Sequence, residues 1–271
     1  MTLVVALVWG RGVLVSADSR ASTGIVFHEE RKIEPIYFGS GDDELDLAVA
    51  GGAGDAALVK SGFEVMKEVF SSWIENAGRR NPDDSELRSI VRTIEDRLMR
   101  RYAELRRFRI NPDVQLLLAS VTNDGKPRLY VFDDRGLAQP MHDNPGYVLL
   151  GRGAVTGGLM LLRLLDYRPG EAWEWDLGLL SAFIIDAVSE VDPSVSPFLG
   201  ESYFIRYDAE KEKVVLGPLT EEAYREYKAK LKKRRALFKL LWGVAEEIEE
   251  DKIEDILRQI KESKRQRQNS N

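Results

Sequence analysis

One residue at the start of the chain combines a hydroxyl and an amine that together could carry out acyl transfer. Thr2 follows Met1, and it is small enough for methionine aminopeptidase to remove Met1, which would leave a free α-amine on Thr2. A threonine hydroxyl is a poor nucleophile without a base. An α-amine titrates near ~8, so an amine on the same residue could accept the hydroxyl proton directly or through a water molecule. Thr2 is therefore a candidate nucleophile that carries its own base; the alternative is a threonine at this position by chance.

Asp18 and Lys32 are the candidate partners of Thr2. Two apolar, β-branched runs separated by a glycine-rich turn predict a β-hairpin over residues 2–17. Because the second strand of a hairpin ends beside the start of the first, we expect Asp18 to lie near Thr2. Lys32 begins the next predicted strand and could reach the same place, where its positive charge would lower the pKa of the amine. Asp18 would hold that lysine in place, although an ordinary ion pair at the strand ends is the alternative.

A glycine-rich segment follows the next predicted strand. Gly51–Gly54 lies between a short predicted strand, Leu47–Ala50, and a predicted helix from Asp55 to about Asn76. Glycines allow a close backbone approach, and their N–H groups would point at the helix entry. The Gly51 N–H is therefore a candidate donor to an oxyanion. A tight turn with a helix cap is the alternative.

Composition excludes several other kinds of site. The chain has no cysteine and only two histidines, His28 and His142, which lack ligand spacing, so we expect no metal site and no cofactor. The segment Gly151–Gly157 imitates a dinucleotide-binding turn, but no βαβ unit with a terminal acidic residue follows it.

Charge and hydropathy bear on partners and location. The 39 basic and 45 acidic residues give a net charge of -6, which does not favour nucleic acid as a partner. The basic run Lys228–Arg235 lies close to an acidic stretch and is typical of a solvated or self-pairing helix face. The N-terminus has no basic region of the kind that begins a signal peptide, and no apolar run is long enough to span a bilayer. We therefore expect a cytoplasmic protein that binds neither nucleic acid nor membrane.

The predicted elements come in blocks. Strands over residues 2–50 precede two helices, near residues 55–76 and 86–107; strands over 114–150 then precede two more, near 156–166 and 175–191. Two last strands fit residues 203–207 and 213–216. This order predicts an α+β fold, a four-layer αββα sandwich over residues 1–218. Residues 219–271 are rich in Lys, Arg, Glu, Leu and Ile, and we expect them to form a charged helical extension for subunit packing or partner docking.

These motifs, in this order, resemble the proteasome β-subunit family of N-terminal-nucleophile hydrolases, which includes the bacterial HslV. The matching residues are Thr2, the run Asp18-Ser19-Arg20-Ala21, Lys32 and Ala50-Gly51-Gly52. The resemblance covers roughly residues 2–216.

The resemblance implies a threonine endopeptidase. Thr2 would be the nucleophile and its amine the base, Lys32 would tune the amine, Asp18 would orient Lys32, and the Gly51 N–H would bind the oxyanion. Ser19 and Arg20 belong to the same motif and would support the site. The substrate would be a peptide or an unfolded protein. The family also implies a homo-oligomer, a ring or a related assembly, and an ATPase or regulatory partner could feed it.

The sequence departs from the family pattern near the site. The segment between Asp18 and Lys32 is two residues shorter than usual, and Arg152 stands where the family has a serine beside the nucleophile. Asp192 fits a supporting aspartate, but Val195 stands where a serine would follow. An arginine at position 152 would favour acidic substrates. The departures leave two alternatives open: a catalytically silent scaffold or assembly subunit, and a peptide ligase that passes the same acyl group to an amine.

Overall fold

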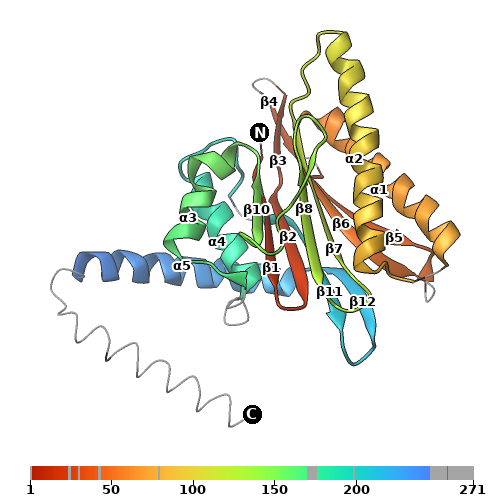
Figure 1. Ribbon diagram of the computed structural model, residues 1–271. Coiled ribbons are helices and arrows are strands. Elements are labelled where there is room, and N and C mark those ends of the chain that lie inside the picture. The colour runs from red at the N-terminus through yellow and green to blue at the C-terminus, as the bar shows by residue number, and fades with distance from the viewer. Residues whose placement is uncertain are drawn as a thin grey trace. The chain divides into compact units, whose positions relative to one another are not determined.

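The structure of the chain is a computed structural model that describes residues 2–23, 26–29, 31–41, 44–78, 80–169, 176–197, 199–244 and 255 (Figure 1). Side chains are described for most of these residues, though not for residues 21–23, 26–29, 238, 239, 241, 242 and 244. The chain divides into two compact units, Met1–Tyr227 and Lys228–Asn271. The first unit contains both sheets and the candidate site.

Two five-stranded antiparallel sheets form the centre of the first unit. The first sheet has the order β10-β1-β2-β11-β12, from strands β10 (Tyr147–Leu150), β1 (Val4–Trp9), β2 (Gly12–Asp18), β11 (Leu199–Asp208) and β12 (Lys213–Pro218). The second has the order β5-β6-β7-β8-β9, from strands β5 (Ile33–Phe38), β6 (Leu45–Gly54), β7 (Val114–Val121), β8 (Pro127–Phe132) and β9 (Ala138–Pro140). Strands β3 (Arg20–Thr23) and β4 (Val26–Glu29) form a separate hairpin between β2 and β5.

Helices cover the outer face of each sheet (Figure 1). Helices α1 (Ala56–Ala77) and α2 (Asp84–Arg107) pack on the second sheet. A π-helical turn η2 (Ala154–Gly158), α3 (Leu159–Leu164) and α4 (Leu177–Ser189) pack on the first. The two long helices begin at aspartates: Asp55 accepts the N–H groups of Ala57 and Leu58, and Asp83 forms a reciprocal capping box with Glu86.

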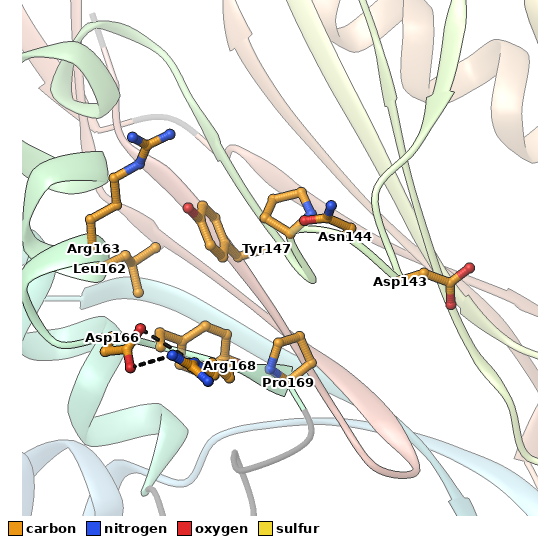
Figure 2. A pocket seen from close by; sticks show the side chains of 10 residues that line it. Asp143, Asn144, Tyr147, Leu162, Arg163, Asp166, Arg168 and Pro169 are labelled. Atoms are coloured by element: carbon orange, nitrogen blue, oxygen red, sulfur yellow. Dashed lines mark hydrogen bonds and ion pairs between the residues drawn. The ribbon is translucent and has the colours of Figure 1, made fainter.

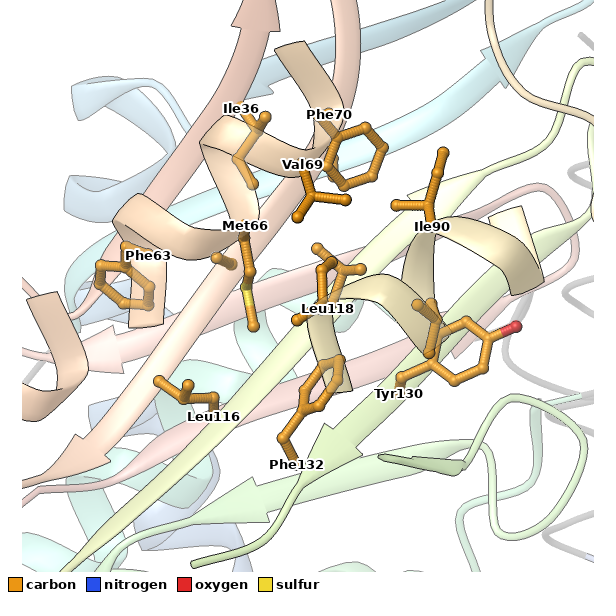
Figure 3. Close-up of a cluster of buried hydrophobic side chains, with 14 of the residues drawn as sticks. Ile36, Phe63, Met66, Val69, Phe70, Ile90, Leu116, Leu118, Tyr130 and Phe132 are labelled. Atoms are coloured by element: carbon orange, nitrogen blue, oxygen red, sulfur yellow. The ribbon is translucent and has the colours of Figure 1, made fainter. Parts of the chain in front are cut away.

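Three hydrophobic clusters separate the four layers. The cluster under α1 and α2 joins Phe63, Met66 and Phe70, spaced at helical intervals, to Leu118 and Phe132 of the second sheet (Figure 3). A second cluster fills the space between the two sheets, and a third lies between the first sheet and α3 and α4. The predicted four-layer αββα sandwich is confirmed.

Strand β1 is buried on both faces. Val4, Ala6 and Val8 belong to the cluster between the sheets, whereas Leu3, Val5 and Leu7 belong to the cluster under the helices. Because successive side chains of a strand point to opposite faces, only a run that is apolar at every position fits here. Thr2 therefore lies at the beginning of a strand with no solvent-exposed face.

The structure corrects several predicted elements. The glycines from Gly51 to Gly54 do not form a turn; they continue β6, because they pair with Val114–Leu117 of β7. Strands β3, β4 and β9 were not predicted, since each has only three or four residues. The helix expected over residues 156–166 is divided into η2 and α3, with a non-helical backbone at Gly157. The expected start of the next helix, at Trp175, lies outside the described residues.

The second unit is described over residues 228–244 and at residue 255. Helix α5 (Glu221–Val244) includes its first part. The domain boundary at residue 218 stays a prediction. Within the described residues, no helix has both the length and the apolar character needed to cross a membrane.

Candidate active site

The Asp18 carboxylate, at the end of β2, accepts hydrogen bonds from four donors. Its Oδ1 accepts the Lys32 ammonium at 2.7 Å and the Leu3 N–H at 2.8 Å. Its Oδ2 accepts the N–H groups of Arg20 and Ser196, each at 3.0 Å. The side chain is fully buried. A buried anion is stable only when its acceptor positions are occupied, and here donors from four separate parts of the chain occupy them.

Lys32, immediately before β5, is held at both ends. Its ammonium donates to Asp18 and to the Arg20 carbonyl, and its side chain is 5% exposed. Its own carbonyl accepts the Gly52 N–H at 3.0 Å. The Asp18 charge compensates the buried Lys32 cation, so the cation lies at a fixed position inside the sandwich.

Thr2 is buried, 6% exposed, and its backbone is fixed from two sides. On the β2 side, Leu3 and Asp18 exchange backbone and carboxylate hydrogen bonds. On the β10 side, the Gly153 N–H donates to the Thr2 carbonyl at 3.3 Å. A Cβ on Gly151 would lie 2.2 Å from the same carbonyl oxygen, and Gly151 has a φ of +86°. Glycine is required there by both contact and backbone conformation.

The structure thus brings together Thr2, Asp18 and Lys32, as the sequence predicts. Leu3 N and Lys32 Nζ bind the same Asp18 oxygen, so these two nitrogens are at most about 5.5 Å apart. Leu3 N is bonded directly to the Thr2 carbonyl carbon. The Lys32 charge is therefore close to the residue that would carry the nucleophile and its amine.

Gly51 lies inside β6 near the same place. In register it is opposite Ile33 and Leu117, and a Cβ on it would be 3.2 Å from a Val4 methyl group. Its neighbour Gly52 directs its N–H toward β5, and successive N–H groups of a strand point to opposite edges. The Gly51 N–H therefore faces β7, and its role as an oxyanion donor stays a prediction.

Ser19, Arg20 and the segment 192–196 connect the end of β2 to the end of α4. The Ser19 N–H donates to Ser196 Oγ at 3.0 Å, and the Arg20 guanidinium donates to the carbonyls of Pro193 and Val195. The sequence pattern did not identify Ser196 as a partner of Asp18. Its only signal was that it flanks Val195, whose side chain is fully buried in the cluster under the helices.

Asp192 organises that segment. Its Oδ1 accepts both the N–H and the hydroxyl of Ser194, and its Oδ2 accepts the Thr156 hydroxyl at 3.2 Å. Burial alone would raise the pKa of Asp192, but the bonds from Ser194 and Thr156 and the nearby Arg152 charge outweigh burial and lower that pKa. Asp192 is therefore ionised at neutral pH, and its supporting role at the site stays a prediction.

Arg152 lies between the two glycines that contact the Thr2 carbonyl. Its own carbonyl accepts the Thr156 hydroxyl at 3.3 Å, and its positive charge acts on Asp192. The turn 151–153 therefore places the backbone of an exposed arginine next to the backbone of Thr2.

His142 does not belong to this group. Its Nδ1 lies 3.2 Å from the Leu129 carbonyl, and its ring packs edge-on against Tyr130. The His28 side chain lies outside the described residues. In the described part of the chain, no three acidic or histidine side chains group in a way that could hold a metal ion.

A separate cavity of about 320 Å³ opens near the other end of β10 (Figure 2). It is lined by Tyr147, Arg163 and an Asp166–Arg168 ion pair, among others. Tyr147 pairs with Leu7, whereas Leu150 pairs with Val4 beside Thr2. Three residues of strand, about 10 Å, therefore separate this cavity from the candidate site.

The four-layer αββα sandwich defines the class of this protein, an N-terminal-nucleophile hydrolase fold. Residues 2–154 match the family model described as "Proteasome subunit". The chain belongs to the proteasome subunit family.

Solved structures share the fold at low sequence identity. Anbu (ancestral beta-subunit) from Yersinia bercovieri is 13% identical, with a TM-score of 0.64 over 89% of this chain and 97% of that chain. An Anbu (Gly-1) mutant from Hyphomicrobium sp. strain MC1 is 17% identical, with a TM-score of 0.65 over 92% of this chain and 99% of that chain. The structure titled "Helical Assembly of the Anbu Complex from Pseudomonas aeruginosa" is 16% identical, with a TM-score of 0.63 over 91% of this chain and 97% of that chain. A comparison with curated proteins found no match.

The Asp18 geometry gives a stability prediction. In an Asp18→Asn variant one carboxylate oxygen becomes an NH₂ group that faces N–H donors, and the Lys32 cation loses its counter-charge. We expect unfolding free energy to fall by about 3–5 kcal/mol, as measured by urea denaturation. The control Asp133→Asn changes a partly exposed aspartate that also accepts backbone N–H groups, and it should cost under about 1 kcal/mol. Equal losses in the two variants would contradict this description of Asp18.

Proposed function

We propose that this protein is a threonine peptidase or amidase whose nucleophile is Thr2 after removal of Met1. The observation that carries the proposal is the Lys32 ammonium held on Asp18 Oδ1, the oxygen that also binds the first N–H after Thr2. A buried cation near an α-amine favours the neutral amine, which is the form that can act as a base.

The reaction follows from these groups. The Thr2 hydroxyl oxygen attacks the carbonyl carbon of the peptide bond while the α-amine takes the hydroxyl proton. The tetrahedral intermediate expels the leaving amine, which receives that proton, and an acyl ester remains on Thr2. A water molecule then gives a proton to the Thr2 α-amine, and its oxygen attacks the ester carbonyl. The acid is released as the α-amine returns the proton to the Thr2 oxygen, which restores the hydroxyl.

The oxyanion needs a hydrogen-bond donor. We propose the Gly51 N–H for this role on the family resemblance alone; within β6 that N–H faces β7. Ser19, Arg20 and Asp192 would act through the backbone of the loops that they connect: Ser19 and Arg20 bind the segment 193–196, and Asp192 binds Ser194 and Thr156.

Two alternatives have specific motives. A catalytically silent assembly subunit is favoured by Arg152 and Val195, which replace two family serines. A peptide ligase would use the same acyl-threonine and pass the acyl group to an amine instead of water. Retention of Met1 would favour the silent subunit, because an acylated amine cannot act as a base.

We also propose that the protein forms a homo-oligomer. Large apolar side chains are exposed together along η2 and α3, where Val155 is 89%, Met160 69% and Leu164 64% exposed. Apolar groups at this density on one surface are typical of protein contacts. The helical assembly named for the Pseudomonas aeruginosa relative is consistent with a second copy as the occupant. An ATPase or regulatory partner and the role of residues 219–271 stay predictions.

The nucleophile is tested by the intact mass of the purified protein with and without a peptide epoxyketone. That reagent needs a hydroxyl and a free α-amine on one residue to close its ring. We expect loss of Met1 and a single adduct, which Thr2→Ser should keep and Thr2→Ala should lose. An unchanged mass that still includes Met1 would overturn the proposal in favour of the silent subunit.

Substrate charge is tested at Arg152. We expect Arg152→Ser to lower kcat/KM for peptides with an acidic residue at the cleaved bond by about fivefold relative to neutral peptides, the equivalent of ~1 kcal/mol. Arg163→Ser is the matched control, because it removes the same charge at the separate cavity. If both variants and the parent prefer the same peptides, Arg152 does not set this preference.

The apolar surface is tested by the mass of the assembly. Met160→Asp should shift the protein to smaller species in light scattering, since it replaces an exposed apolar side chain by a charge in the segment that also exposes Val155 and Leu164. Phe108→Asp, at a 78% exposed apolar residue after α2, should leave the assembly mass unchanged. An unchanged mass for Met160→Asp would place the contact between copies elsewhere.

A further inference from the structure

A β-bulge in β11 directs one carboxylate from the first sheet toward the second. The register of β11 on β2 shifts between Leu199, opposite Asp18, and Glu201, opposite Ala17. The residue between them is Gly200, and a Cβ there would lie 2.6 Å from the Ser19 backbone nitrogen. Bulges occur near active sites, where they change the direction of a side chain. Here Gly200 is the extra residue, so Glu201 is the first residue of β11 that pairs with β2 after the pair of Leu199 and Asp18.

The Glu201 carboxylate binds the backbone that carries Lys32. Its Oε2 accepts the Ile33 N–H at 3.3 Å, and the Lys32 N–H lies close enough to act on the pKa of this carboxylate. Strand β5 is the edge of the second sheet, so its outer N–H groups have no neighbouring strand to bind. Glu201 supplies the acceptor that a strand would otherwise supply.

The charges around Glu201 are few. The Arg31 guanidinium lies 3.9 Å from Oε1, and Glu34 is the nearest acidic group on β5. Two tyrosines on other elements also interact with this group: Tyr224 of α5 with Glu201, and Tyr203 of β11 with Arg31. Burial raises the pKa of Glu201, while Arg31 and the two N–H groups act in the opposite direction.

With Glu201 included, Lys32 is held at its side chain and on both sides of the peptide bond that follows it. The ammonium binds Asp18 and the Arg20 carbonyl, the Lys32 carbonyl binds the Gly52 N–H, and the next N–H, of Ile33, binds Glu201. The lysine side chain is flexible, with four rotatable bonds. Its ammonium therefore stays on Asp18 only if the Lys32 backbone is held at the right distance from that carboxylate.

We propose that Glu201 is a positioning residue for the reaction: it fixes the backbone of Lys32 and Ile33 and so keeps the Lys32 ammonium on Asp18 beside Thr2. The proposal rests on the function proposed above. A positioning role predicts that an uncharged side chain that accepts the same hydrogen bonds, such as glutamine, restores the rate of reaction at Thr2.

The experiment uses the full chain and three variants: Glu201→Ala, Glu201→Gln and the control Glu34→Ala. Glu34 is a carboxylate on β5, next to Ile33, that pairs with Arg31 and Lys67. Two quantities are measured: hydrogen exchange of a peptide covering residues 31–36, and the second-order rate of the epoxyketone adduct. Thermal unfolding establishes that each variant is folded.

We expect Glu201→Ala to speed exchange in that peptide and to slow the adduct about 10- to 100-fold, as a small displacement of a reacting group does. Glu201→Gln should recover most of the rate, because its amide oxygen accepts the same bonds, and Glu34→Ala should change neither quantity. Unchanged exchange in Glu201→Ala would overturn the proposal, and so would faster exchange with an unchanged adduct rate. If the parent itself forms no adduct, the proposed function fails, whereas the exchange data still decide whether Glu201 holds this backbone.

Discussion

The ion pair between Asp18 and Lys32 is the interaction on which the arrangement around Thr2 depends. It joins the two sheets, because Asp18 ends a strand of the first and Lys32 precedes a strand of the second. Burying both charges costs desolvation free energy, which is offset only when each charge keeps good hydrogen-bond partners. Leu3, Arg20 and Ser196 supply those partners from the backbone. The same contacts that make the pair tolerable therefore also fix the chain around Thr2.

The sandwich gives this pair its setting. Strand β1 is apolar on both faces, so Thr2 is carried to the edge of a dry core rather than to a solvated loop. In such surroundings a charge is screened less than in water, and the Lys32 cation acts more strongly on a nearby amine. The glycines at 151 and 153 let the turn after β10 approach the Thr2 carbonyl, and the residue between them is an arginine. A site built this way combines a local motif with contacts between distant segments.

Sequence reasoning predicted the local part well. The β-branched runs of the hairpin, the helical spacing of α1 and α2, and the nearness of Asp18 to Thr2 follow from short-range patterns. Ser196 and Glu201 could not be predicted in the same way, since they reach Asp18 and Lys32 from segments more than a hundred residues later and depend on a loop and a bulge. The glycines of β6 read as a turn because the sequence does not reveal that β7 pairs with them. Pairing with β7, rather than the turn preference of glycine, makes residues 51–54 part of strand β6.

The proposal that Lys32 keeps the Thr2 amine neutral is tested most directly by the pKa of that amine. Protein labelled with ¹⁵N-threonine would be titrated by NMR, following the nitrogen of Thr2. We expect a free amine with a midpoint below the ordinary value of about 8, because the Lys32 cation disfavours a second positive charge. A midpoint at or above that value, or an amide signal from a Thr2 still joined to Met1, would contradict it.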